Sequence, residues 1–161
     1  MHAIAHLFPF FKNRELSEIY TSIAIRAFAL SLIGVFVPIF FYLKGYSLIS
    51  IFFFYIIHSV ANIAFSIPVA KMSSKFGIKH CILISVPCLI VFFFLLYSLE
   101  IFNWPLWLLA VSAALSTAMF WIPHHIEFAK FSDKKNRAKE IGLSGIVACL
   151  VSVTGPILGG V

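Results

Sequence analysis

Three polar side chains recur at regular intervals within a long apolar stretch of the sequence. His58, Asn62 and Ser66 are four residues apart, so in a helix they share one face. A polar stripe is costly in lipid unless it faces other helices or a water-filled path. One interpretation is that the stripe lines a route for a substrate or a proton, with His58 as its titratable member. The other is that these side chains hydrogen-bond neighbouring helices. The residues alone leave both open.

Arg26 is the only charged residue in the first apolar stretch, residues 19–43. One interpretation places its guanidinium opposite an anionic group in a central cavity. In the other, the long side chain carries the charge to the cytoplasmic headgroups, because residues 27–43 alone are long enough to cross a membrane.

Groups that could carry enzymatic chemistry are sparse. His124 and Glu127 are three residues apart and resemble half of a metal site, but the sequence holds no second carboxylate–histidine set and no HExxH motif. We expect the Glu127 carboxylate instead to pair with a cytoplasmic Lys or Arg, or to act as a gate at the cytoplasmic opening of the bundle. We therefore expect no metal, no cofactor and no catalytic residue, and we do not expect an enzyme. An alternative is a membrane enzyme built on His124, His125 and Glu127, and its metal-dependent form would require stoichiometric metal.

The cysteines offer no metal-ligand spacing or disulfide framework either. All lie inside or at the edge of apolar segments, and we interpret them as small packing residues: Cys81, Cys88 and Cys149.

The composition restricts the class of protein. Of the 161 residues, 61% are hydrophobic and 11% are charged, and the mean hydropathy is +1.03. Soluble domains carry about 45–50% apolar and about 25% charged residues, so this is a polytopic membrane protein. The net charge of +6 reflects basic residues between apolar runs, and we expect no nucleic-acid partner.

Five stretches of the sequence are long enough to cross a bilayer as helices. They lie at about residues 19–43, 45–70, 81–99, 101–127 and 141–161. We predict an all-α bundle of five transmembrane helices over residues 19–161, preceded by a cytoplasmic tail at residues 1–18. The alternation of polar and apolar residues that barrel strands require is absent.

The basic residues predict the orientation. With the N-terminus in the cytoplasm, ten of the twelve Lys and Arg residues lie on the cytoplasmic side, whereas the exterior loops hold only Lys44. We therefore expect an integral, multi-pass protein of the cell or inner membrane with its N-terminus inside.

The cytoplasmic link at residues 70–79 reads AKMSSKFGIK. It resembles the loop motif G-x-x-x-D-[RK]-x-G-[RK]-[RK] of the major facilitator superfamily of secondary transporters, with matches at Lys75, Gly77 and Lys79. Three motif positions differ, and at one of them Ser74 stands where the family has Asp. In the family that Asp belongs to a latch that closes the inner gate. The resemblance therefore implies a role in an inner-gate loop for the three matching residues, Lys75, Gly77 and Lys79, and not for the positions that differ.

The last apolar stretch carries a second resemblance to the same family. Residues 155–160 are similar to its G-P-x-x-G-G motif, and Arg137 through Gly142 are similar to the R-x-x-x-x-G stretch that commonly opens its fifth helix. The resemblance implies a hinge and packing face formed by Gly155, Pro156, Gly159 and Gly160.

Family members have two six-helix halves, with substrate bound between them near the midplane. The resemblance therefore implies that this chain is an N-terminal portion, five of the first six helices. We expect it to end as a fragment, because no interfacial anchor flanks Val161.

The implied function is secondary active transport of a small solute by alternating access, with proton-coupled efflux through His58 as one hypothesis. The implied partners are the bilayer, an unknown solute, and a missing C-terminal half or another protomer. The alternative is a non-catalytic five-span accessory or scaffold protein that assembles through its Gly-rich fifth helix.

Overall fold

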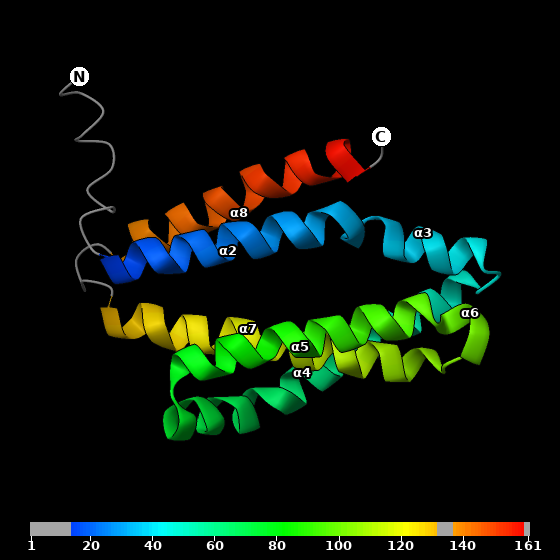
Figure 1. Cartoon of the computed structure of the whole chain (residues 1–161), viewed down its shortest axis with the longest axis horizontal. Coiled ribbons are helices and arrows are strands. Elements are labelled where there is room, and N and C mark those ends of the chain that lie inside the picture. Colours follow the sequence, from blue (N-terminus) through cyan, green and yellow to red (C-terminus); the bar gives the residue numbers. More distant parts are fainter. Residues whose placement is uncertain (1–13, 132–136, 160–161) are drawn as a thin grey trace. The chain divides into compact units, whose positions relative to one another are not determined.

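A computed structural model of the chain describes residues 14–131 and 137–159, and the regular structure of these residues is entirely α-helical (Figure 1). Residues 1–13 of the predicted tail lie outside the described residues. The elements are α2 (Arg14–Gly34), α3 (Phe36–Leu43), α4 (Leu48–Phe76), α5 (Ile78–Tyr97), α6 (Leu99–Phe102), α7 (Leu106–Phe131) and α8 (Arg137–Gly159).

Four helical segments among the described residues are long and apolar enough to cross a membrane. They are Ser17–Leu43, Leu48–Phe76, Ile78–Tyr97 and Leu106–Lys130. The apolar part of α8 is shorter, Ile141–Ile157, and the predicted fifth span ends at residues outside the described part of the chain. The predicted all-α membrane protein is confirmed, and a crossing by α8 stays a prediction.

The first apolar stretch is divided into two helices. A turn at Val35 separates α2 from α3. Pro38 lies four residues after Gly34, and a proline has no N–H to donate to that carbonyl and clashes with it. The local sequence therefore explains why the helix is interrupted at this point.

The described residues form two compact units, one containing residues 14–40, 128–131 and 137–159, the other Phe41–Glu127. In the first unit, α2 packs along α8 (Figure 1). Near the start of α2, the ring of Tyr20 packs against Phe128, with centroids 5.9 Å apart. The large apolar side chains of α8 remain exposed: Ile141, Ile146, Leu150, Val153 and Ile157.

In the second unit, a core forms where α4, α5 and α7 meet. Val69 of α4 packs with Ala118 and Met119 of α7. The hydroxyl of Ser116 on α7 donates a hydrogen bond of 3.2 Å to the carbonyl of Ser85 on α5. Both serines are fully buried, so this bond joins two apolar helices through a satisfied polar contact.

The turn after α3 is a Schellman motif. Gly45 has a φ of 85°, which is readily adopted only by glycine. Its N–H donates to the Tyr42 carbonyl, and the Tyr46 N–H donates to the Phe41 carbonyl. The rings of Phe41 and Tyr46 pack edge to face, 5.9 Å apart. This apolar contact usually accompanies the motif, and it fixes the direction in which the chain enters α4.

The link between α5 and α7 is also tightly built. Asn103 ends the short α6 in the left-handed conformation, with a φ of 48°. The indole N–H of Trp104 donates to the Ser98 hydroxyl at 3.0 Å. Helix α7 begins at Leu106, directly after Pro105, a residue that suits a helix start.

Candidate functional site

The polar stripe predicted on the second span lies on α4. His58, Asn62 and Ser66 are all half-buried. Apolar side chains at neighbouring positions of the helix are exposed: Val60, Ile63 and Ile67. The stripe is therefore more protected than the lipid-compatible positions around it.

The members of the stripe differ in how they use their hydrogen-bonding groups. The Ser66 hydroxyl donates to the Asn62 carbonyl of its own helix at 2.9 Å. Within the described part of the chain, the side chains of His58 and Asn62 make no hydrogen bond. An imidazole and a carboxamide on one half-buried face can bind a polar solute, and the imidazole can also carry a proton.

Arg26 lies on α2 and is buried, with 9% of its surface exposed. A side chain that reaches the membrane surface leaves its charged end in water. The burial of Arg26 does not match a charged end that lies in open water, and its place on a path through the membrane stays a prediction.

The residues of the predicted inner-gate loop surround a one-residue turn. Helix α4 continues past the predicted boundary at residue 70 and ends at Phe76, and α5 begins at Ile78. Gly77 between them has a φ of 93° and donates its N–H to the Ser73 carbonyl. Lys75 lies over the ring of Phe76, 5.4 Å from its centroid, and Lys79 is exposed. Both basic side chains therefore flank the turn on helix ends.

Ser74, which stands in place of the family's Asp, is engaged with its own helix. Its hydroxyl donates to the Lys71 carbonyl at 2.8 Å. A neutral side chain bonded in this way cannot act as the acidic member of a latch.

The Gly-Pro segment of α8 lies at the contact with α2. Gly155 is buried, and a Cβ atom at this position would overlap the Ser31 hydroxyl and lie 3.0 Å from the Ser31 backbone carbon. The close approach of the two helices therefore requires a residue without a side chain. Pro156 lies inside α8, which ends at Gly159; Gly160 is outside the described residues.

His124 and Glu127 are both buried near the end of α7. The Nδ1 atom of His124 is 2.8 Å from the Phe120 carbonyl, and its ring packs on Phe120 at 4.1 Å. His125 is exposed and stacks on Trp121 instead. Among the described residues, no three His, Cys, Asp or Glu side chains are placed to hold a metal ion.

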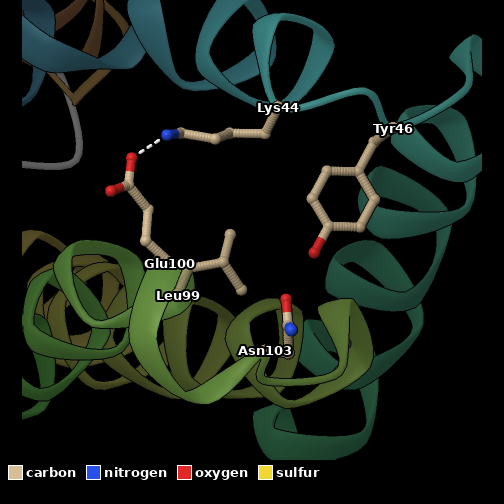
Figure 2. Close-up of a pocket in the computed structure, with 5 residues that line it drawn as sticks. All are labelled: Lys44, Tyr46, Leu99, Glu100 and Asn103. Carbon is tan, nitrogen blue, oxygen red and sulfur yellow. Dashed lines mark ion pairs between the residues drawn. The ribbon is translucent and has the colours of Figure 1, made fainter.

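Sequence reasoning missed a pocket that the turns of the second unit form. It has a volume of about 330 Å³ and is lined by Lys44, Tyr46, Leu99, Glu100 and Asn103. Lys44 and Glu100 form an ion pair, and the Tyr46 hydroxyl and Asn103 amide point into the same space (Figure 2). The only sequence signal is the presence of opposite charges in two links predicted to lie outside.

Comparison with protein families gives one match. A sequence model described as the Major Facilitator Superfamily matches residues 19–161. Comparisons with curated proteins and with solved structures gave no match.

Proposed function

We propose a function from one premise: the chain belongs to the Major Facilitator Superfamily. Members of this superfamily are membrane transporters that bind substrate near the midplane and expose it to alternate sides. In our proposal this chain contributes the first five helices of such a transporter. It moves a small polar solute, and His58 and Asn62 of α4 contact that solute.

The observation that carries the proposal is the unused hydrogen-bonding capacity on α4. Polar groups in a membrane helix are expected to find protein partners or a watery cavity. The side chains of His58 and Asn62 are half-buried and make no hydrogen bond to described residues. This favours the cavity interpretation over helix–helix bonding for these two residues. The buried Arg26 is our third candidate for the path.

Proton coupling is the finer part of the proposal. His58 is the titratable member of the α4 stripe, and an imidazole nitrogen can take up and release a proton. A histidine on the substrate path can therefore exchange a proton in each transport cycle. Efflux driven by an inward proton gradient is the form that this coupling would take.

The test is transport by cells that express the protein. We would measure movement of ethidium and of radiolabelled amino acids and sugars, relative to cells without the protein. The double variant H58A/N62A should lose about tenfold in rate for the transported solute, because a buried polar contact to a solute contributes about 1–3 kcal/mol.

Ser59→Ala is the matched control. Ser59 is exposed on the same helix and bonds its own backbone at Tyr55, so its loss should leave the rate unchanged. A double variant that transports like the native protein would contradict the assignment of the path. For the proton hypothesis, an unchanged pH dependence in His58→Ala would be the contrary result.

The scaffold alternative has one observation in its favour. A Cβ at Gly142 or at Gly145 on α8 would meet nothing within 4 Å, so this part of the helix is open to another helix. The open surface at Gly142 and Gly145 is equally suited to packing against the second half of a transporter. The surface at Gly155 is already covered by α2. We therefore keep transport as the proposed function.

A further inference from the structure

The pocket between the two turns of the second unit has a chemistry that the transport proposal does not use. Lys44 follows α3, and Glu100 lies in α6, so the two charges come from different turns and meet at one edge of the pocket (Figure 2). Both are accessible, with side-chain exposures of 36% and 55%. A ligand can therefore reach a cation and an anion that lie next to each other.

The rest of the lining is suited to the oxygens of a small polar group. The Tyr46 hydroxyl and the Asn103 amide point into the pocket, and Leu99 supplies an apolar surface (Figure 2). The volume of about 330 Å³ is at the small end of the range for ligand sites. It fits a headgroup rather than a large organic molecule.

The location points to the membrane surface. Exposed aromatic side chains surround the same helix ends: Tyr42 at the end of α3, Tyr97 at the end of α5, Phe102 in α6 and Trp107 at the start of α7. Of these, the Tyr and Trp side chains are of the types that are enriched at the level of the lipid headgroups. The pocket therefore opens where phospholipid headgroups lie.

We propose that this pocket binds the headgroup of a zwitterionic phospholipid with a primary ammonium group, such as phosphatidylethanolamine. The headgroup separates Lys44 from Glu100. Its phosphate then accepts hydrogen bonds from Lys44, Tyr46 and Asn103, and its ammonium donates to the Glu100 carboxylate. A purely anionic headgroup would be repelled by Glu100. A trimethylammonium group has no N–H to donate, so charge-assisted hydrogen bonds distinguish the two zwitterionic lipids.

The experiment is native mass spectrometry of the full protein released from nanodiscs that contain phosphatidylethanolamine, phosphatidylcholine and phosphatidylglycerol in equal amounts. The native protein should retain phosphatidylethanolamine preferentially. Lys44→Gln and Glu100→Gln should each reduce its retention about tenfold, as expected when a charged partner is lost. Lys71→Gln, which removes an exposed lysine from the other end of α4, should have no effect.

Tyr46→Phe provides a variant that keeps the ion pair and the ring packing on Phe41. It should lower phosphatidylethanolamine retention by a smaller factor of about three, because only one neutral hydrogen bond is lost. Equal retention of the three lipids by the native protein would overturn the proposal, as would full preference in Glu100→Gln. Displacement of the lipid by millimolar glycine, with glycine retained in its place, would assign the pocket to a soluble zwitterion and also overturn it.

Discussion

Polar side chains in these apolar helices differ in where their hydrogen bonds go. The hydroxyls of Ser59, Ser73 and Thr117 each donate to a carbonyl one turn earlier in their own helix. Such internal bonds hide a hydroxyl from lipid without involving another element. An imidazole or a carboxamide has more groups to satisfy, which is why we propose an external partner for His58 and Asn62 within the α4 stripe. Ser66 bonds within its own helix in the same way, so we do not include it in the proposed path.

At the scale of single residues, we predict that the stability of the protein depends on Gly155. Gly155→Ala places a Cβ against Ser31, including its backbone, so the two helices must separate. We expect the variant to lose about 1–3 kcal/mol of unfolding free energy, the usual cost of overpacking. The measurement is thermal unfolding in detergent followed by circular dichroism.

Gly145→Ala is the control for this prediction. It makes the same change in the same helix, where a Cβ would meet nothing within 4 Å. Alanine is the better helix former by about 1 kcal/mol, so this variant should be unchanged or more stable. If the Gly155→Ala protein is as stable as the Gly145→Ala protein, the helices α2 and α8 do not approach each other closely at Gly155, and the prediction is wrong.

At the scale of elements, the one-residue turn between α4 and α5 depends on backbone conformation. Gly77 has a φ of 93° and a ψ of 146°, a region that is almost exclusive to glycine. Gly77→Ala should therefore cost about 1–3 kcal/mol through strain, even though the nearest atom to the added Cβ is 3.5 Å away. Thermal unfolding of the purified protein would measure this loss.

Gly34→Ala is the matched change without strain. Gly34 ends α2, a Cβ there would meet nothing within 4 Å, and its φ is not positive. It should have little effect on the melting temperature. Equal melting temperatures for the two variants would contradict a role for Gly77 in holding the turn. A lower melting temperature for Gly77→Ala alone would explain why the motif of the predicted inner-gate loop has glycine at this position.

The sequence predicts the elements better than their contacts. Long stretches without charge indicate membrane helices because only helices satisfy the backbone of a single apolar segment in lipid. The interruption at Val35 was missed, although Pro38 is its local cause. The pocket was missed for another reason: Lys44 and Glu100 are far apart in the sequence, and their pairing depends on how two turns are placed by Gly45 and Asn103. The positive φ values of Gly45 and Asn103 are set only when the chain folds, so the sequence alone does not show how these turns place the two charges.

At the scale of the whole molecule, the basic residues predict that the two ends of the helices face different compartments. In a variant without Cys81, Cys88 and Cys149, a single cysteine would be placed either at Lys44 or at Lys75. Both lysines are exposed at helix ends, so both cysteines should react when the membrane is permeable.

In intact cells, a membrane-impermeant maleimide should label Lys44→Cys but not Lys75→Cys, because positively charged segments remain in the cytoplasm. The opposite pattern would invert the orientation and place the headgroup pocket in the cytoplasmic leaflet. Labelling of both positions from outside would contradict a membrane crossing by α4, and with it the assignment of His58 to a path through the bilayer.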